Sequence, residues 1–184
     1  MPDAGWIEVI SGPMFSGKTE ELIRRLRRAV IAGQAVGIFK PSVDVRYHPE
    51  EVVSHDARSL PSVSVGRAEE LLDRAASFKV VGIDEAQFFG PELVEVANAL
   101  ADRGQRVVVA GLDLDHLGRP FGPMPNLMAT AEFVTKVHAI CVRTGGLAHY
   151  SLRKDPEGQL IQLGHSDAYE PVSRAVFAQI RRRS

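Results

Sequence analysis

The residues from Gly12 to Thr19 carry the most specific chemistry in this 184-residue chain. They read GPMFSGKT and fit the pattern G-x-x-x-x-G-K-[ST], in which a glycine-rich turn presents backbone N–H groups to a phosphate. Lys18 adds a positive charge, and the hydroxyl of Thr19 is a suitable ligand for Mg²⁺. The pattern therefore predicts a phosphate-binding loop, or P-loop, for a nucleotide.

Two flanking segments must hold this loop in place. The apolar run Trp6–Ile10 predicts a buried strand over about residues 7–11, and the sequence after the loop predicts a helix over about 18–32 that stops at Gly33. A strand, a glycine turn and a helix start direct backbone donors and the positive end of the helix dipole at a phosphate. The alternative, a glycine-rich turn that closes a strand–helix unit without a nucleotide, is less favoured by these flanks.

A second chemical signature is the apolar run Lys79–Ile83, which is followed by Asp84 and Glu85. An Asp at the end of a buried strand can hold Mg²⁺ beside the P-loop hydroxyl. Adjacent residues near a strand end point to different sides, so Glu85 can face an acceptor and act as a general base. Position alone does not separate water, the acceptor of an ATPase, from the alcohol acceptor of a small-molecule kinase.

The other segments alternate between strand and helix, as in an α/β protein with a parallel sheet. From about Val142, short alternating segments indicate a small β-rich appendage. We therefore expect a P-loop core domain over residues 1–140 and a small domain over 141–184. Strands are predicted at 36–40, 62–65, 106–111 and 133–141, helices at 68–76, 91–103 and 126–132, and a long loop at 42–60.

Composition narrows the class of protein. The chain is 45% hydrophobic and 24% charged with a formal net charge of −1, which argues against disorder and against a sequence-independent grip on nucleic acid. Cys141 is the single cysteine, so no intramolecular disulfide is possible. No signal peptide and no membrane-spanning run are expected, and a cytoplasmic location is the default expectation.

Several sequence blocks, in order, resemble the type II thymidine kinase family, the cytosolic form shared by bacteria and animals. The resemblance spans the chain from Val9 to Phe177 and is more specific than the P-loop alone. The blocks that carry it are residues 12–19, 40–41, 44–47, 54–56, 84–89, 111–115, 119–125, 131–132, 134–136 and 139–141.

The resemblance implies a RecA-like P-loop core and a small C-terminal domain whose "lasso" loop closes over the nucleoside. It implies ATP-dependent phosphorylation of the 5′-hydroxyl of thymidine to give thymidine monophosphate. Glu85 would be the general base, Lys18 would steady the transferring phosphoryl group, and Thr19 and Asp84 would hold Mg²⁺. The implied ATP-binding residues are Gly12, Pro13, Met14, Phe15, Ser16, Gly17, Lys18, Thr19, Asp84, Glu85, Ala86 and Gln87. The implied nucleoside-binding residues are Met14, Phe88, Leu112, His116, Phe121, Ser151, Gly164 and Tyr169.

The sequence departs from the family pattern at a metal site. The family's small domain holds zinc through two Cys-x-x-Cys-like pairs, and the matching positions here are Cys141, Thr144, Ser173 and Val176. A structural zinc site needs four good donors, so we expect no structural zinc. Cys141 and Val176 are instead expected to pack together, and Thr144 and Ser173 to share a hydrogen bond.

Other departures fall near the implied nucleoside site. His116 stands where the family commonly has phenylalanine, and His165 replaces the second residue of a common Gly-Gly pair. Arg58 is one place away from a family arginine, so no role is assigned to it. Arg46 is a candidate for neutralising phosphate charge or an exposed loop residue. The preference between thymidine and deoxyuridine stays open.

Three function classes are weighed. The first is the thymidine kinase, for which the family implies a homotetramer and feedback inhibition by thymidine triphosphate, without nucleic-acid or membrane partners. The second is a RecA-type ATPase or nucleic-acid motor module, which the near-zero net charge disfavours. The third is a regulatory nucleotide-binding protein without catalysis, which the retained Lys18, Thr19, Asp84 and Glu85 disfavour.

Overall fold

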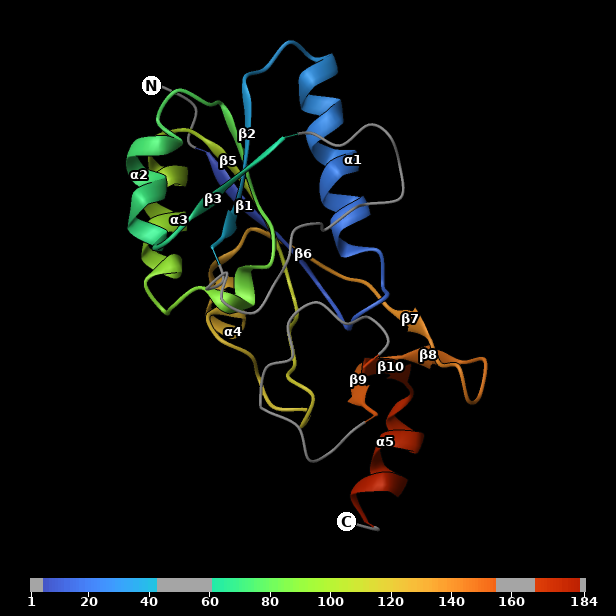
Figure 1. Cartoon of the computed structure of the whole chain (residues 1–184). Coiled ribbons are helices and arrows are strands. Elements are labelled where there is room, and N and C mark those ends of the chain that lie inside the picture. The colour runs from blue at the N-terminus through green and yellow to red at the C-terminus, as the bar shows by residue number, and fades with distance from the viewer. Residues whose placement is uncertain (1–4, 43–60, 155–167, 183–184) are drawn as a thin grey trace.

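The structure, a computed structural model, describes residues 5–42, 61–154 and 168–182. The predicted loop at 42–60 lies, except for Ser42, outside the described residues, as do Arg46, Arg58, Gly164 and His165. The described part is an α/β fold with a large sheet in the middle and a small group of strands and one helix at the C-terminal end (Figure 1). This confirms the predicted fold class.

The large sheet has six strands in the order β3-β2-β4-β5-β1-β6, and every neighbouring pair is parallel. Parallel strands covered on both faces need nearly continuous apolar sequences, which explains runs such as Val107–Ala110, where each residue is fully buried. The six strands are β1 (Trp6–Ser11), β2 (Val36–Pro41), β3 (Ser62–Val65), β4 (Val80–Ile83), β5 (Arg106–Gly111) and β6 (Phe133–Lys136).

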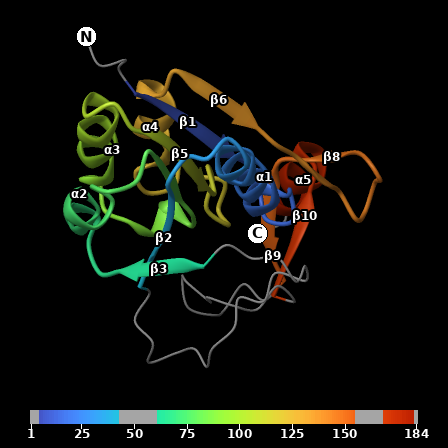
Figure 2. The same cartoon turned by 90° about the horizontal axis from the view of Figure 1, so that it is seen from above.

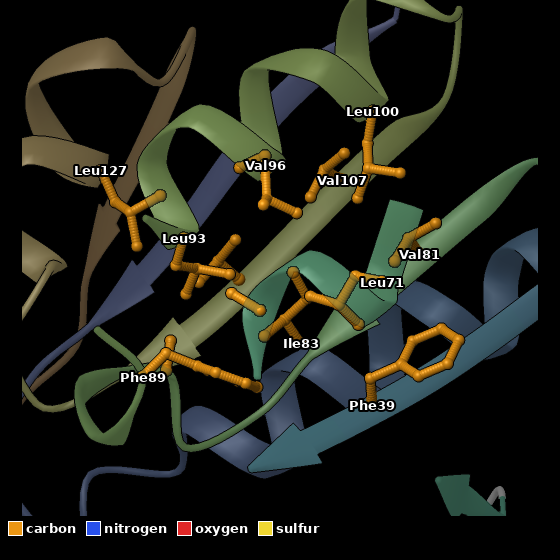
Figure 3. Packing of buried hydrophobic residues seen from close by; sticks show 14 of the residues in the cluster. Phe39, Leu71, Val81, Ile83, Phe89, Leu93, Val96, Leu100, Val107 and Leu127 are labelled. Atoms are coloured by element: carbon orange, nitrogen blue, oxygen red, sulfur yellow. The ribbon is translucent and has the colours of Figure 1, made fainter. Parts of the chain in front are cut away.

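Helices cover the two faces unequally. α1 (Lys18–Ile31) packs alone on one face through Leu22, Leu26 and Ala29. α2 (Leu71–Arg74), α3 (Leu93–Asp102) and α4 (Met124–Thr130) cover the other face, as Figure 2 shows from above. The larger of the two core clusters that border the sheet lies under these three helices, where Leu93, Val96 and Leu100 meet Ile83 and Val107 (Figure 3).

A buried charge cluster fixes α1 against the sheet. Glu8 on β1 accepts hydrogen bonds from Arg25 of α1 at 2.8 Å and from Arg106 of β5 at 2.6 Å. Burial opposes ionisation of Glu8, but hydrogen bonds from Arg106, Trp6 and Arg25 outweigh it and lower the pKa of this carboxyl. Because α1 begins at Lys18, within the predicted P-loop, this cluster also helps to set the loop's position.

The C-terminal region is built from short antiparallel pairs. β7 (Ala139–Ile140) pairs with β8 (Leu147–Ala148), β9 (Tyr150–Arg153) pairs with β10 (Tyr169–Val172), and α5 (Arg174–Arg181) follows. These elements enclose a separate small core of seven buried residues, which are Ala139, Cys141, Ala148, Tyr150, Val172, Val176 and Phe177.

Several predicted elements differ from those observed. The strand predicted over 133–141 is divided into β6 and β7, because the chain changes partner from β1 to β8 after Val137, whose N–H still bonds to Ser11 O at 2.8 Å. The helix predicted over 91–103 begins at Leu93, and Pro91 lies in the turn before it. The segment predicted as one helix over 68–76 is a 3₁₀ turn, Ala68–Glu70, followed by α2.

Candidate active site

The glycine-rich loop lies between the end of β1 and the start of α1, as predicted. A Cβ atom on Gly12 would collide with the carbonyl oxygen of Val137, so the close approach of these two segments requires glycine. Pro13 O accepts hydrogen bonds from Ser16 Oγ and from Lys18 Nζ, both at 2.7 Å. The lysine of the loop is therefore folded back over the turn that would hold a phosphate.

Lys18 is in a strongly acidic neighbourhood. Burial lowers the pKa of its ammonium group, while the charges of Glu85, Asp84 and Asp113 act in the opposite direction. Asp84 and Asp113 follow the neighbouring parallel strands β4 and β5, so the carboxyl ends of these strands meet at one edge of the sheet. At this edge Lys18 could neutralise the charge of a phosphate group, and the carboxylates could bind the metal ion that accompanies it.

Thr19 and Asp84 are brought together as the sequence predicted. Thr19 Oγ1 donates a hydrogen bond to Asp84 Oδ2 at 3.1 Å, across the gap between α1 and β4. Burial, and then the adjacent charge of Glu85, raise the pKa of Asp84 to about 6. A hydroxyl and a carboxylate in this arrangement are oxygen ligands of the kind that Mg²⁺ takes together with phosphate oxygens and water.

Glu85 lies beside Asp84 on an exposed turn. Its φ of 52° is in the left-handed region, and among the described residues other than glycine only Phe15 of the P-loop shares this conformation. Its backbone N–H donates to Asp84 Oδ1 at 2.9 Å. Backbone conformations of this kind are unfavourable for non-glycine residues and cluster at functional sites. The two non-glycine residues that adopt it both belong to the predicted ATP-binding set.

Gln87 was predicted in the same set, and the structure places its side chain in the interior, 2% exposed. Its Nε2 donates to Glu85 Oε2 at 2.5 Å, and its Oε1 accepts from the backbone N–H of Leu112 at 3.0 Å. Ala86 is buried beside it in the short turn Ala86–Phe88.

The predicted nucleoside-binding residues that the structure describes come from five segments: the P-loop, the turn Ala86–Phe88, the segment after β5, and the strands β9 and β10. Phe88 and Phe121 meet edge to face, with ring centroids 5.7 Å apart and planes at 87°. Leu112, His116 and Phe121 are half-buried in the segment after β5, in which Phe121 N donates to Asp113 O at 3.1 Å. Tyr169 begins β10 and is half-buried.

The P-loop and the C-terminal region touch directly. The hydroxyl of Ser151, on β9, accepts a hydrogen bond from the backbone N–H of Met14 at 2.9 Å. Ser151 and Met14 were both predicted at the nucleoside site, and the structure brings them together. Gly164, the remaining residue of that set, lies outside the described residues.

Asp113 and Lys136 were missed by the sequence reasoning as members of this site. Asp113 is buried, and Lys136 Nζ lies 2.8 Å from its Oδ2. Their position in the sequence could have identified them, because each lies at the carboxyl end of a strand of the parallel sheet. Asp113 follows β5 and Lys136 ends β6, at the same sheet edge as Asp84 and the P-loop.

The four positions of the family's zinc site do not fit a zinc ion. Val176 has no donor atom and lies in the small core with Cys141, as expected. Ser173 Oγ accepts a hydrogen bond from Val176 N at 3.4 Å and caps α5. The buried Cys141 thiol is hydrogen-bonded to Thr144, which is the largest cause of the lowering of its pKa to about 6. The expected Thr144–Ser173 hydrogen bond is therefore replaced by two separate ones. Within residues 5–42, 61–154 and 168–182, no three or more His, Cys, Asp or Glu side chains are grouped to hold a metal.

The described helices are α1 to α5 and two short 3₁₀ turns, Ala68–Glu70 and Ala86–Phe88. None of them combines the length and the apolar character that crossing a bilayer requires.

Comparison with known proteins identifies the family. The sequence model described as thymidine kinase matches residues 5–177. A protein named thymidine kinase from Rhodothermus sp. strain ITI 518 is 58% identical over 174 residues, covering 94% of this chain and 81% of that protein. One from Porphyromonas gingivalis strain ATCC 33277 is 56% identical, covering 94% and 85%, and one from Bacteroides thetaiotaomicron strain VPI-5482 is 51% identical, covering 96% and 89%. The chain with this P-loop and this acidic sheet edge therefore belongs to the thymidine kinase family.

Proposed function

We propose that this protein transfers the γ-phosphoryl group of ATP to the 5′-hydroxyl of thymidine, giving thymidine monophosphate in nucleotide salvage. The observation that carries the proposal is the convergence of Lys18, Thr19, Asp84 and Glu85 at one edge of the sheet, with Thr19 Oγ1 3.1 Å from Asp84 Oδ2. Family membership supplies the substrate class.

The phosphate groups are assigned to the P-loop, residues 12–19. Its backbone N–H groups and the start of α1 bind the phosphates, and Lys18 leaves Pro13 O to neutralise the transferring group. Thr19 and Asp84 would hold Mg²⁺, which offsets phosphate charge when it is bound with ATP. Asp84 binds the metal in its ionised form, so we expect metal binding to weaken as the pH falls below the raised pKa of about 6.

Glu85 is assigned as the general base. It accepts the proton of the 5′-hydroxyl as that oxygen forms a bond to the γ-phosphorus and the bond from that phosphorus to the bridging oxygen of ADP breaks. Most of the rate acceleration then comes from positioning and charge neutralisation, as expected for phosphoryl transfer.

The base of the nucleoside is assigned to the apolar surface between the P-loop and β9. Phe88, Leu112 and Phe121 supply apolar contacts, and Met14, His116, Ser151, Gly164 and Tyr169 complete the set. We further propose that residues 141–184 act as a separate lasso domain over a core of residues 1–140. The Ser151–Met14 hydrogen bond supports a closed arrangement of the two.

We propose a homotetramer with thymidine triphosphate as feedback inhibitor. Exposed apolar side chains support an association surface, since Phe133 is 57% and Val134 44% exposed on β6, one of the two edge strands of the sheet. Light scattering on the purified protein should give about four times the 20.1 kDa chain mass. A mass of one chain would reject the tetramer.

The experiment that tests the function is phosphate transfer from ATP to a panel of nucleosides, with Mg²⁺ and with water as the only other acceptor. Rapid formation of thymidine monophosphate, with transfer to purine nucleosides slow, is the expected result, and the deoxyuridine rate measures the role of the methyl group. ATP hydrolysis without transfer to any nucleoside would reject the kinase. Hydrolysis stimulated by DNA would then favour the motor-type ATPase.

A further inference from the structure

The side chain of Gln87 forms a bridge inside the proposed active site. Its amide contacts Glu85 Oε2 at 2.5 Å on one side and the backbone N–H of Leu112 at 3.0 Å on the other. A backbone N–H can only donate, so the amide oxygen must face Leu112 and the NH₂ group must face the Glu85 carboxylate. The orientation of the amide is thus determined by the main chain at the end of β5.

The space around Gln87 leaves its side chain little freedom. It is 2% exposed, and a Cβ atom on Gly111 would lie 2.9 Å from its Oε1. A Cβ atom on Gly122 would collide with the carbonyl oxygen of Gln87 itself. Two glycines from separate segments therefore allow the surrounding chain to close tightly on this one residue.

Glu85, in contrast, is exposed and has a long side chain. Among the side chains that the structure describes, Gln87 is the one that hydrogen-bonds to its carboxylate. A carboxylate with several free torsions spends little time in one geometry unless a fixed partner holds it, and proton transfer requires a defined geometry. A rigid buried amide is such a partner.

Resting on the proposed function, we propose that Gln87 is a positioning residue for phosphoryl transfer. Its amide holds Glu85 toward the acceptor hydroxyl and ties this orientation to Leu112, a residue of the proposed nucleoside site. Gln87 then acts through Glu85, in place of the ATP contact that the family resemblance implied. A nucleoside that shifts the main chain at Leu112 would therefore also shift the carboxylate of Glu85, the proposed general base.

The test is a double-mutant cycle in the thymidine kinase assay with Gln87→Met and Glu85→Gln. Methionine has the length of glutamine and forms no comparable hydrogen bond. Gln87→Met should lower kcat about 10- to 100-fold and leave KM for ATP within about twofold, because an oriented base is worth factors of this size. In the Glu85→Gln background the same change should lower kcat by less than about twofold, because the carboxylate that Gln87 orients is no longer present.

Gln105→Met is the matched control. Gln105 is also buried, and its Nε2 donates to Ala75 O at 2.8 Å and Phe78 O at 2.7 Å, away from the site. This change should lower the melting temperature and leave kcat unchanged. If Gln87→Met does not fold, Gln87→Leu removes the same donor with a smaller side chain, and it should show the same fall in kcat.

The outcomes separate the two proposals. An inactive wild type overturns both. An active wild type with unchanged kcat in Gln87→Met overturns the positioning role alone. Equal losses of kcat with and without Glu85 also overturn it, since Gln87 would then act independently of the base. A rise in KM for ATP with kcat retained would return Gln87 to the ATP-binding set.

Discussion

The carboxyl edge of the large sheet and the C-terminal region, residues 139–154 and 168–182, position their side chains by different means. At the sheet edge, Asp84 and Asp113 follow strands whose backbone pairing fixes where each strand ends. In the C-terminal region the paired strands are short, and position depends on side-chain packing. The same chain thus uses hydrogen-bonded ladders for the proposed chemistry and packing for the proposed cover over the nucleoside.

Packing in the C-terminal region is centred on two aromatic rings. Tyr150 and Phe177 stack with centroids 4.3 Å apart and planes at 8°. Gly118, with a φ of 73°, rests on their edges, and a Cβ there would lie 2.9 Å from Phe177 Cε1. The loop that carries His116 and Gly118 therefore packs against the small core that also contains Cys141 and Val176, two of the four positions that match the family's zinc site. Four predictions test whether the two regions are as different as this comparison suggests.

The largest effect is expected at the sheet edge. Glu85→Gln should lower kcat about 10²- to 10⁴-fold, because the proposed general base is lost, while ATP affinity changes little. Single-turnover kinetics and ATP titration measure the two quantities. Glu95→Gln, on the exposed side of α3, is the control and should leave both unchanged. A kcat for Glu85→Gln near that of the wild type would remove Glu85 from the mechanism.

The next effect is expected in the C-terminal region. Phe177→Ala should destabilise it by about 3 kcal/mol through the lost stacking and the cavity left behind. KM for thymidine should rise, since Ser151 and Tyr169 lie on the strands packed beside it, while ATP affinity should be retained. Urea denaturation and substrate titration check this. Leu147→Ala, at a side chain that is 58% exposed in the same region, should change stability by less than about 0.5 kcal/mol. Equal losses of ATP and thymidine affinity in Phe177→Ala would mean that the two regions are not separable.

A smaller effect concerns stability and pH at Asp84. Its pKa is raised from 3.8 to about 6, so the folded state favours the protonated carboxyl. This contribution to stability is fully present below about pH 4 and is lost as the pH rises to 6. At pH 7.5, without nucleotide, Asp84→Asn should therefore stabilise the protein by on the order of 2 kcal/mol, and the difference should vanish near pH 4.

Thermal melts between pH 4 and 8 measure this difference. Asp102→Asn, at an exposed position on α3, should not change the pH dependence. Lower stability of Asp84→Asn at pH 7.5 would show that the native Asp84 carboxylate is well solvated or paired, and that burial and the charge of Glu85 do not oppose its ionisation.

The smallest effect is expected from metal removal. The purified protein should contain no stoichiometric zinc, and a chelator should leave its melting temperature unchanged, because Val176 offers no donor and Ser173 Oγ already caps α5. The triple change T144C, S173C and V176C, added to the native Cys141, should bind zinc and make stability chelator-sensitive. Stoichiometric zinc in the wild type would show that a metal, and not side-chain packing alone, holds the C-terminal region.

Much of the fold could be predicted from the sequence because its signals are local. The apolar runs at 80–83 and 106–111 and the glycine-flanked P-loop each specify an element without reference to distant residues. The division of the strand predicted at 133–141 could not be foreseen, since both halves have strand-like sequences and only the change of partner from β1 to β8 separates them.

In the candidate site, too, some contacts could be predicted from local motifs and others could not. The Thr19–Asp84 contact followed from two motifs, each with a known place at a strand or helix end. The Gln87–Leu112 link and the approach of Asp113 to Lys18 depend on strand order and on side-chain directions between residues 25 or more positions apart in the sequence. No spacing rule encodes such contacts, so they became visible only in the assembled fold.

The hydrogen bond from Met14 N–H to Ser151 Oγ gives the molecule a built-in reporter. Met14 lies in the loop assigned to phosphate, and its amide proton is held by a side chain from the C-terminal region. The exchange of that single proton with solvent therefore measures how often the two regions part. Its exchange rate, followed by NMR with and without thymidine, would time the opening of the nucleoside site without any label added to the protein.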